Sequence, residues 1–377
     1  MNDDQHWMEI ALGLARRGQG YVEPNPMVGC VVVRDGELIS SGFHERFGGP
    51  HAEVHALRDL DAADLTDATL YVTLEPCAHQ GKTPPCVDLV LSKRPKRVVV
   101  AMQDPFEHVS GKGISRLIQA GIEVTVGVLE AQAKVLNAPY LKRIVCGLPW
   151  VIAKWAMTLD GAIASSTGDS KWISHELSRK QVHQLRARVD AIIVGSSTVI
   201  ADDPLLTARL DLGQRPARRA VRVVLDRRFR IPETCQLVRS AKDTPVMIAV
   251  EVKALDLLAQ KRRLFEDHGV EFLELGPSSS KSVGLELDGI LRELARRGAT
   301  SVLVEGGAGV LGSFFDAGLV DQVECYVAPK VLGGALAHRP VSGIGIEAIS
   351  KANEFQNVQW ESLGGDLHFS GFLARRF

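Results

Sequence analysis

The sequence predicts a two-domain α/β protein. The chain has 377 residues, which is more than one compact core usually holds and is comfortable for two domains. Strand-like apolar runs alternate with helix-like stretches in both halves, an order typical of sheets covered by helices. The tripeptide Gly147-Leu148-Pro149 interrupts this alternation. We expect it to join a first domain, residues 1–147, to a second domain, residues 148–377.

Composition and charge narrow the classes of function. Hydrophobic residues make up 45% of the chain and charged residues 24%, as in ordinary globular proteins. The net charge of -1 gives no electrostatic reason to expect a nucleic-acid or membrane partner. No apolar run reaches membrane-spanning length or is typical of a secretion signal. Six cysteines in a chain this long do not make a disulfide scaffold, so we expect a protein of the reducing cytoplasm.

Periodicity predicts the elements of the first half in order. Apolar residues recur at helical spacing from residue 6 to 16, and two strand-like runs flank the hairpin turn Arg34-Asp35-Gly36. Helix and strand patterns then alternate, so we expect a mixed sheet with helices on both faces. The expected elements are helix 6–16, strands 27–33 and 37–43, a helix entered at His51, strand 71–74, helix 86–91, strand 97–102, helix 113–120, strand 123–128 and helix 130–145.

Two short segments of the first half carry metal-ligand chemistry. His51 lies in a Pro-His-Ala-Glu sequence, and Cys77 and Cys86 each follow a proline. One imidazole and two thiolates are the ligand set of a catalytic zinc site, which leaves a fourth position for water. His-x-Glu followed by Pro-Cys is typical of zinc-dependent nucleobase deaminases, in which the glutamate is not a ligand. We therefore expect zinc on these three residues and Glu53 as the catalytic acid and base.

Two other metal sites are compatible with parts of this pattern. His51 and His55 are four residues apart, as in helical zinc proteases, but a protease needs glutamate at position 52, where this chain has alanine. His51 should therefore lie in the entry turn of its helix, and His55 should be a packing residue. A closed structural site with His79 as the fourth ligand is the remaining alternative, although it leaves Glu53 without a role.

The second half shows the same alternation, which predicts another α/β domain. Strands are expected at 151–155, 191–195, 221–225, 246–250, 271–275, 301–304 and 322–328, with a last strand, 367–374, at a sheet edge. Helices are expected at 175–188, 253–268, 285–297 and 310–317.

A glycine-rich sequence lies between a strand and a helix of this second half. Residues 307–312 read Gly-Ala-Gly-Val-Leu-Gly, and such a pattern lets backbone N–H groups approach a phosphate. The acidic residue that a Rossmann fold places after the next strand is missing. We therefore expect a phosphate-binding loop in a different fold. A glycine turn needed only for tight packing is the alternative.

Three further segments stand out in the second half. Residues 158–161 and 196–204 follow strands, where α/β proteins bind ligands. The run 215–230 contains seven arginines, which we interpret as a solvated face, with contact to an anionic ligand as the alternative. These patterns indicate a phosphate-bearing ligand but do not indicate the reaction.

Longer motifs run through both halves in a fixed order. They are Asn25-Pro26-Met27-Val28-Gly29-Cys30, His51-Ala52-Glu53-Val54-His55-Ala56, the segments 71–77, 81–86 and 165–173, Ala201-Asp202-Asp203-Pro204 and Val304-Glu305-Gly306-Gly307. With these motifs the chain resembles, almost from end to end, the bifunctional deaminase-reductases of riboflavin biosynthesis.

The resemblance implies both a fold and an activity for each half. The first half would be a cytidine-deaminase-like three-layer domain with a mixed sheet, and the second a dihydrofolate-reductase-like α/β domain. The first would use zinc to hydrolyse the 2-amino group from a diamino-ribosylamino-pyrimidinone phosphate. The second would use NADPH to reduce the ribosyl group to ribityl. The expected partners are small phosphorylated pyrimidines, and the expected assembly is a homo-oligomer.

The resemblance also implies roles for individual side chains at both sites. His51, Cys77 and Cys86 would hold zinc, and Glu53 would shuttle protons. The deaminase substrate would be held by Asn25, His44, His79 and Lys82. The cofactor positions would be Ala156, Trp172, Thr198, Asp202, Gly307, Ala308, Gly309, Val310, Leu311, Gly312 and Ser313. The reductase substrate would contact Ser170, Arg186, Leu206, Arg209 and Glu305, with the two guanidinium groups as phosphate partners.

Two positions depart from the family pattern. Phe106-Glu107 stand where the family has Asn-Pro, and we expect them to reshape one wall of the deaminase pocket. Arg227 stands where some relatives carry a hydroxyl residue near the cofactor. We expect its guanidinium to contact the 2′-phosphate of NADPH.

Two other functions are weighed against this one. A nucleic-acid-editing deaminase would need a basic, aromatic-lined groove, and the near-neutral charge and four tyrosines argue against it. A non-catalytic, zinc-stabilised binding protein would have no use for Glu53.

Overall fold

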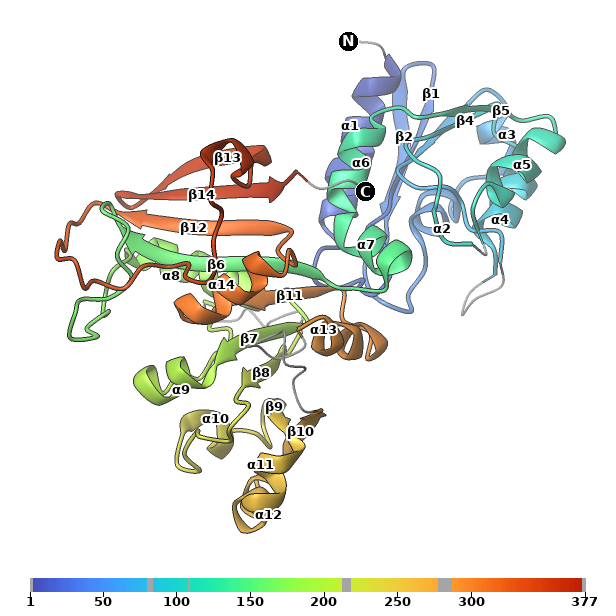
Figure 1. The fold of residues 1–377 in the computed structure, drawn as a ribbon. Helices are drawn as coiled ribbons and strands as arrows, with labels where there is room; N and C mark the ends of the chain where they lie inside the picture. The colour runs from blue at the N-terminus through green and yellow to red at the C-terminus, as the bar shows by residue number, and fades with distance from the viewer. Residues whose placement is uncertain (1–2, 80–83, 108, 212–217, 277–286, 375–377) are drawn as a thin grey trace. The chain divides into compact units, whose positions relative to one another are not determined.

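The structure is a computed structural model that describes residues 3–79, 84–107, 109–211, 218–276 and 287–374 (Figure 1). The chain divides into two compact units, Met1–Gly147 and Leu148–Phe377. Among the helices within the described ranges, none has the length and apolar character that crossing a membrane requires.

The described part of the first unit is built on a mixed five-stranded sheet with the order β2-β1-β3-β4-β5. Strand β1 runs antiparallel to both of its neighbours, whereas β3, β4 and β5 are parallel. Asp35 and Gly36 take positive φ angles in the turn between β1 and β2, so the predicted hairpin is confirmed. The strands are β1 Gly29–Arg34, β2 Glu37–Phe43, β3 Thr69–Val72, β4 Arg97–Val100 and β5 Glu123–Val126.

Helices cover both faces of this sheet because successive strand residues point to opposite sides. In β1, Val31 packs with residues of α1 and α6, while Val32 packs with residues of α2 and α4. The predicted three-layer arrangement is therefore confirmed. The helices are α1 Asp3–Arg16, α2 Ala52–Leu57, α3 Ala62–Leu65, α4 Cys86–Lys93, α5 Lys112–Gln119, α6 Glu130–Leu136 and α7 Ala138–Cys146.

One predicted helix of the first unit is wrong, because residues 130–145 form two helices, α6 and α7, that meet at Asn137. The buried amide of Asn137 hydrogen-bonds the backbone of Met27, which fixes the chain there outside helical geometry. Pro139 in the first turn of α7 has no N–H to continue the hydrogen bonds of α6. A contact between residues far apart in sequence thus ends the local periodic pattern.

The second unit contains, in its described residues, a nine-stranded sheet with the order β10-β9-β8-β7-β11-β6-β12-β14-β13. The seven strands from β10 to β12 are parallel, and β14 and β13 add antiparallel pairs. The strands are β6 Trp150–Thr158, β7 Ala191–Gly195, β8 Val221–Leu225, β9 Val246–Glu251, β10 Val270–Leu275, β11 Ser301–Val304, β12 Gln322–Ala328, β13 Phe355–Leu363 and β14 Asp366–Leu373.

The main core of the second unit lies between this sheet and helices α13 and α14. Val151, Val223 and Val302 face it from the strands, and Leu291 and Phe314 face it from the helices. The helices are α8 Glu176–Arg186, α9 Ser196–Asp202, α10 Gln236–Arg239, α11 Val252–Leu257, α12 Ala259–Asp267, α13 Leu287–Arg296, α14 Ala308–Asp316 and the 3-10 turn Ile349–Lys351.

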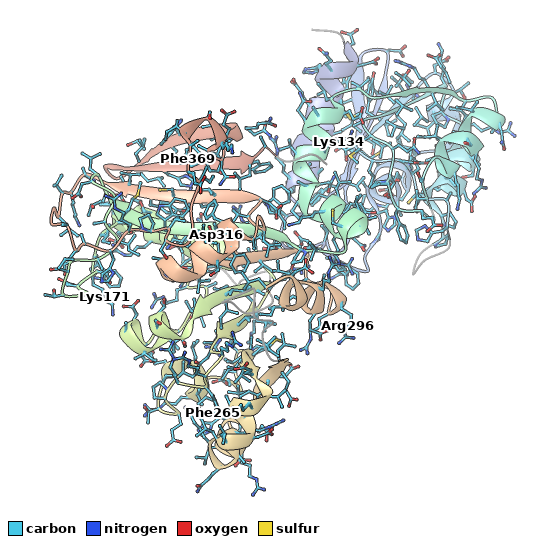
Figure 2. All side chains as sticks on the ribbon, viewed as in Figure 1. Lys134, Lys171, Phe265, Arg296, Asp316 and Phe369 are labelled. Carbon is cyan, nitrogen blue, oxygen red and sulfur yellow. The ribbon has the colours of Figure 1, made fainter. Side chains whose placement is uncertain are left out.

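The prediction that the last strand lies at a sheet edge is wrong. Strand β14 pairs on both sides, with β12 and with β13, and β13 is the edge strand. Most of β13 is exposed, so it carries no alternating apolar pattern from which it could be predicted. Trp360 of β13 packs against Phe369 of β14, which is labelled in Figure 2, and their ring centres are 4.8 Å apart.

Two other local predictions of the second unit differ from the structure. The helix predicted at 253–268 is two helices, α11 and α12, that meet at Leu258. Most of the segment 196–204, for which no helix was predicted, forms helix α9. Arg222 also contradicts the interpretation of the arginine run as a solvated face, because its side chain is fully buried.

Arg222 is buried because it lies in β8 on the face opposite to Val223 and Leu225. Its guanidinium donates to the Ser240 hydroxyl at 2.7 Å, to the Leu205 carbonyl oxygen at 3.1 Å and to the carbonyl oxygens of Ser240 and Thr244. Burial lowers the pKa of Arg222 to about 10. Oxygen acceptors of nearby loops therefore replace water around this charge.

The topology of the sheet brings several strand ends together. Strand β11 lies between β7 and β6, although it follows both in sequence (Figure 1). Ser196 after β7, Asp160 after β6 and Glu305 after β11 therefore share the carboxyl edge of adjacent parallel strands. Ligands of open α/β sheets bind at such an edge.

Candidate active sites

A metal-ligand group lies at the ends of two helices of the first unit. Within the described residues it is the one group of histidine, cysteine and acidic residues suited to a metal: the ligand atoms of His51, Cys77 and Cys86 all lie within 4.8 Å of one another. His51 is the N-cap of α2, in extended geometry, and Cys86 is the first residue of α4. The Cys86 Sγ atom is 3.2 Å from His51 Nδ1, and the Cys77 Sγ atom is 3.6 Å from it.

The helix that carries His51 is seated by a glycine of the neighbouring strand. A side chain at Gly42 in β2 would place its Cβ 2.7 Å from the Ala52 carbonyl oxygen and 2.5 Å from the Cβ of His55. Only glycine allows this approach of α2 to the sheet. The Ser40 hydroxyl also donates to the Ala56 carbonyl oxygen at 2.7 Å. The position of His51 is thus set by backbone packing.

The electrostatics of the two thiols fit a divalent cation. Hydrogen bonding with Cys86 lowers the pKa of the Cys77 thiol to about 4, and Cys77 Sγ also accepts the Cys86 backbone N–H at 3.3 Å. The same contact, together with burial, raises the pKa of Cys86. Two thiols this close share a proton, and a cation between them is what allows both to be thiolates. One imidazole and two thiolates form the donor set of zinc.

Glu53 is a buried carboxylate beside this group. It lies in the first turn of α2, and only 3% of the residue is exposed. Burial, with the nearby Cys77, raises its pKa to about 7. A carboxyl group with a pKa near neutrality can both accept and donate a proton during a reaction.

The two alternative metal sites do not form in this structure. His55 follows on α2 with its buried Nε2 atom unpaired, and it lies outside the ligand group. His79 also lies outside the group, and its ring meets the edge of Phe106 at 5.8 Å. The described residues therefore give three protein ligands and no closed site with four.

Two other deaminase candidates are connected to the same group by contacts. Asn25 Nδ2 is 3.1 Å from His44 Nε2, and His44 Nδ1 is 2.9 Å from the Pro50 carbonyl oxygen. The His44 ring then meets the ring of His51 at 5.3 Å. Lys82 lies outside the described residues.

The glycine-rich loop of the second unit begins α14. Gly307 is the N-cap, and its backbone N–H donates to the Thr198 hydroxyl at 3.0 Å, which joins two of the cofactor candidates. A Cβ at Gly312 would lie 2.0 Å from the Ser342 carbonyl oxygen, so packing requires that glycine. A Cβ at Gly309 would meet nothing within 4 Å. Packing alone therefore explains Gly312 but leaves Gly309 open for a ligand.

The segment that packs on Gly312 is fastened to the end of the same helix. The Asp316 carboxylate accepts the backbone N–H groups of Ile344 at 2.8 Å and Gly345 at 3.1 Å (Figure 2). The sequence patterns could not predict this contact, because it joins a helix end to an irregular loop. It holds residues 342–345 against the helix that the glycine-rich loop begins.

Two reductase-substrate candidates form a buried ion pair. The Glu305 carboxylate accepts Arg186 Nε at 2.6 Å and Nη2 at 2.8 Å, and Lys154 Nζ lies 3.5 Å away. Burial alone would raise the pKa of Glu305, but the charges of Arg186 and Lys154 lower it to about 2. Lys154 was not predicted, although a lysine within the apolar strand β6 was a usable signal.

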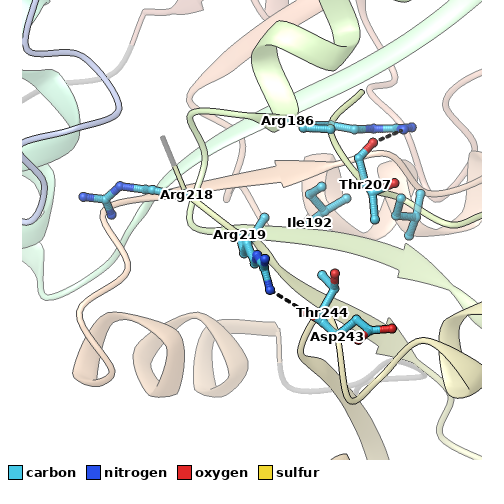
Figure 3. Close-up of a pocket in the computed structure, with 10 residues that line it drawn as sticks. Arg186, Ile192, Thr207, Arg218, Arg219, Asp243 and Thr244 are labelled. Atoms are coloured by element: carbon cyan, nitrogen blue, oxygen red, sulfur yellow. Dashed lines mark hydrogen bonds between the residues drawn. The ribbon is translucent and has the colours of Figure 1, made fainter. Parts of the chain in front are cut away.

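The Arg186 guanidinium therefore binds the Glu305 carboxylate and is not free to bind a phosphate through the same nitrogen atoms. Its Nη1 atom also donates to the Thr207 carbonyl oxygen at 3.4 Å, beside a pocket of about 400 Å³ (Figure 3). Leu206 lines the same pocket, and Arg219 crosses it to donate to the Asp243 carbonyl oxygen at 2.9 Å. The pocket is within the size range of small-ligand sites.

Arg209 joins this region through a neutral histidine. Arg209 Nε and Nη2 lie 3.2 and 3.1 Å from His183 Nε2. Burial, with the charges of Arg186 and Arg209, lowers the pKa of His183 to about 4, so its ring can accept these hydrogen bonds. His183 Nδ1 then faces the Thr207 carbonyl oxygen at 3.2 Å, which Arg186 also contacts.

The remaining cofactor and substrate candidates lie on other segments. Trp172 is 63% exposed, with the Arg179 guanidinium 4.7 Å from its ring centre, and Lys330 Nζ donates to its carbonyl oxygen at 2.6 Å. Ala156 lies in β6, Ser170 precedes α8, and Asp202 ends α9. Within the described residues, no hydrogen bond or ring contact joins these last three to the glycine loop.

Arg227, expected to meet the cofactor, lies after β8 at the carboxyl edge of the sheet. Its Nη2 atom forms an ion pair with Glu251 Oε1 at 2.8 Å. Arg230 lies near it and donates to the Ser196 hydroxyl at 2.8 Å. Both guanidinium groups therefore already have protein partners, Glu251 at the end of β9 for Arg227 and Ser196 at the start of α9 for Arg230.

The sequences of both units are similar to those of known proteins. The family model for the RibD C-terminal domain matches residues 149–369, and that for the cytidine and deoxycytidylate deaminase zinc-binding region matches residues 1–102. The riboflavin biosynthesis protein RibD of Actinobacillus pleuropneumoniae is 40% identical over 97% of this chain and 94% of its own. That of Escherichia coli strain K12 is 37% identical over 98% and 99%. The chain belongs to the RibD family.

Solved RibD structures share the fold of the whole chain. RibD from Acinetobacter baumannii, form 1, has a TM-score of 0.85 at 38% identity, with 99% of each chain covered. A diaminohydroxyphosphoribosylaminopyrimidine deaminase/5-amino-6-(5-phosphoribosylamino)uracil reductase from Thermotoga maritima has a TM-score of 0.79 at 36% identity, again over 99% of each chain. The predicted α/β fold class and the predicted family are therefore confirmed. As a RibD protein, the chain is a bifunctional deaminase and reductase of riboflavin biosynthesis, with Zn²⁺ and NADPH as cofactors.

Proposed function

We propose that residues 1–147 deaminate 2,5-diamino-6-ribosylamino-4(3H)-pyrimidinone 5′-phosphate and that residues 148–377 reduce the product to 5-amino-6-ribitylaminouracil 5′-phosphate. The observation that carries the first step is a three-ligand metal group with a buried Glu53 beside it. The deaminase and reductase activities of the Thermotoga maritima relative support the choice of substrates.

Deamination follows from the properties of Glu53. His51, Cys77 and Cys86 would hold zinc, which would act as a Lewis acid and make a water molecule nucleophilic at neutral pH. Glu53 takes the proton of that water as it attacks the ring carbon that carries the amine. Glu53 then gives the proton to the leaving nitrogen, which departs as ammonia. Its burial excludes bulk water from competing for this proton.

Substrate contacts at this site are proposed for Asn25, His44, His79 and Lys82. Asn25 pairs with His44, whose ring contacts His51, and His79, two residues after Cys77, contacts Phe106. Amide and imidazole groups can pair with the polar edge of a pyrimidine. Lys82 completes the set as a partner for the phosphate.

Reduction requires the cofactor and the sugar to meet at the carboxyl edge of the second sheet. The proposed cofactor residues are Ala156, Trp172, Thr198, Asp202 and Gly307 through Ser313, and the proposed substrate residues are Ser170, Arg186, Leu206, Arg209 and Glu305. Positioning the hydride donor against C1 of the sugar supplies most of the rate in this scheme. The Glu305 ion pair fixes Arg186, so Arg209 is the more available anion partner.

We further propose a cytoplasmic homo-oligomer with no nucleic-acid or membrane partner. All six cysteines are free thiols, as a reducing compartment would keep them. Trp360 and Val358 on the edge strand β13 are exposed, which favours contact with another copy of the chain.

The test of this function is a coupled assay of Glu53→Gln. Ammonia release from the pyrimidine phosphate should fall by about 10² or more, the usual scale for a lost acid and base. NADPH oxidation on the supplied uracil intermediate should be unchanged, because that reaction belongs to the other unit. Full ammonia release by Glu53→Gln would refute the assigned role.

A further inference from the structure

Asn137 makes an unusual contact for a residue between two helices. Its side chain is buried, at 1% exposure. Its Oδ1 atom accepts the Met27 backbone N–H at 2.8 Å, and its Nδ2 atom donates to the Met27 carbonyl oxygen at 3.0 Å. One amide side chain therefore satisfies both polar groups of a residue 110 positions away. It pairs with Met27 as a neighbouring strand would.

A short series of contacts connects Met27 to the metal group. Asn25 lies two residues before Met27 and is flanked by Pro24 and Pro26, whose rings limit the backbone on both sides. The Asn25 side chain reaches His44, and the His44 ring meets His51. A displacement of Met27 would therefore move the side chain proposed to hold the pyrimidine.

Tyr140, three residues after Asn137, contacts the loop that carries Phe106. The Tyr140 hydroxyl, from α7, donates to the Asp104 carboxylate, with distances of 2.9 and 3.2 Å to its two oxygens. Asp104 Oδ1 in turn accepts the Phe106 backbone N–H at 2.9 Å, and the Phe106 ring meets His79. The start of α7 thus anchors two separate loops, one that carries Asn25 and one whose Phe106 ring contacts the deaminase candidate His79.

We infer that Asn137 is a positioning residue for the deaminase substrate and that Tyr140 is a second one. This inference rests on the proposed function of the first unit. It also accounts for the break between α6 and α7, since a continuous helix could not present the Asn137 amide to Met27. A shift of about 1 Å in a positioning group is enough to cost a large factor in catalysis.

The sharpest test is Asn137→Asp, which keeps the shape and the acceptor for the Met27 N–H. It replaces the donor with an oxygen that faces the Met27 carbonyl oxygen. KM for the pyrimidine phosphate should rise about tenfold, with zinc content and reductase activity of the full chain unchanged. Tyr140→Phe, which keeps the ring and loses only the hydroxyl, should raise KM about threefold and tests the idea should Asn137→Asp not fold.

Leu65→Ala is the matched control for a purely structural role. Leu65 is fully buried in the same unit, in a core cluster that contains neither Met27 nor Phe106, and its truncation creates a cavity there. It should reduce the amount of active enzyme, and so kcat, at an unchanged KM. A wild-type KM in Asn137→Asp and Tyr140→Phe, or a fall in kcat alone as in the control, would overturn the inference while leaving the proposed function intact. If the wild-type protein released no ammonia from the pyrimidine phosphate, the proposed function would be overturned, and the inference with it.

Discussion

The metal group of the first unit and the Arg186–Glu305 pair of the second unit are both buried and charged, but they draw on different ranges of sequence. Cys77 and Cys86 are nine residues apart, and helix starts place His51 and Cys86, which are 35 residues apart. Arg186 and Glu305 are 119 residues apart and meet only through the order of the strands. Substitution of a metal-group residue should therefore lower the deaminase rate, whereas substitution of a residue of the ion pair should lower the free energy of unfolding.

The largest expected effect is on the metal group. Cys86→Ser should lose zinc and lower the deaminase rate by about 10³, since the metal supplies several kcal/mol of transition-state stabilisation. The reductase rate should be unchanged. Zinc content by atomic absorption and the two assays measure this, with Cys146→Ser, at an exposed cysteine, as the control. Retention of stoichiometric zinc by Cys86→Ser would show that the ligand set is different.

Glu305→Gln should reverse that pattern in the second unit. It leaves the Arg186 and Lys154 charges without their carboxylate, which costs about 3–5 kcal/mol of unfolding free energy. Four of the five tryptophans lie in residues 148–377, so urea unfolding followed by tryptophan fluorescence reports mainly on this unit. Ammonia release by the folded protein should be unaffected. A difference from wild type below about 1 kcal/mol at neutral pH would contradict the proposed role of the pair.

The same variant predicts a pH dependence. The pKa of Glu305 is lowered from 4.5 to about 2 in the folded protein, so its ionised form is favoured by folding. This contribution is complete above about pH 4.5 and is lost as the pH falls towards 2. The stability difference between wild type and Glu305→Gln should therefore shrink over that range. A constant difference down to pH 2 would mean that another group carries it.

A smaller effect is expected for cofactor choice. Arg227→Ala should lower the preference for NADPH over NADH by about tenfold, since a charged hydrogen bond to the 2′-phosphate would be lost. The ratio of kcat/KM with the two cofactors measures this, and Arg228→Ala, at the exposed neighbour, is the control. Glu251→Gln releases Arg227 from its ion pair and should keep or increase the preference. An unchanged ratio in Arg227→Ala would remove this role.

The smallest effect is expected at the family departure. Phe106→Ala removes the ring that meets His79, and an aromatic contact of this kind contributes about 0.5–1.5 kcal/mol. KM for the pyrimidine phosphate should rise about two- to tenfold, while kcat and zinc content stay the same. A changed kcat at constant KM would place Phe106 in the chemistry instead of the pocket wall.

The accuracy of the sequence predictions follows the same division between local and distant contacts. Strands β7, β8, β11 and β12 have the bounds expected from their apolar runs, because burial on both faces leaves a clear signal. The predicted helices failed at Asn137 and at Leu258, and β13 was missed. At Asn137 the deciding contact is with Met27, which no local window contains.

The residues of the sites divide in the same way. The sequence named His51, Cys77, Cys86 and Glu53 because ligand type and short spacing are enough to indicate a metal site. It could not show that Arg186 is held by Glu305, that Lys154 joins them, or that Arg222 is buried, because these depend on strand order and on which face of a strand is covered.

By itself, the sequence determined the α/β class, the order of most elements, the donor atoms of the metal group and the family. These follow from residue type, from periodicity and from motifs that lie within a few turns of chain. Only the tertiary structure decided which charges are neutralised and which helices are interrupted. Those outcomes depend on what each side chain meets after folding, and the free energy of a buried polar group is set by its partner rather than by its neighbours in sequence.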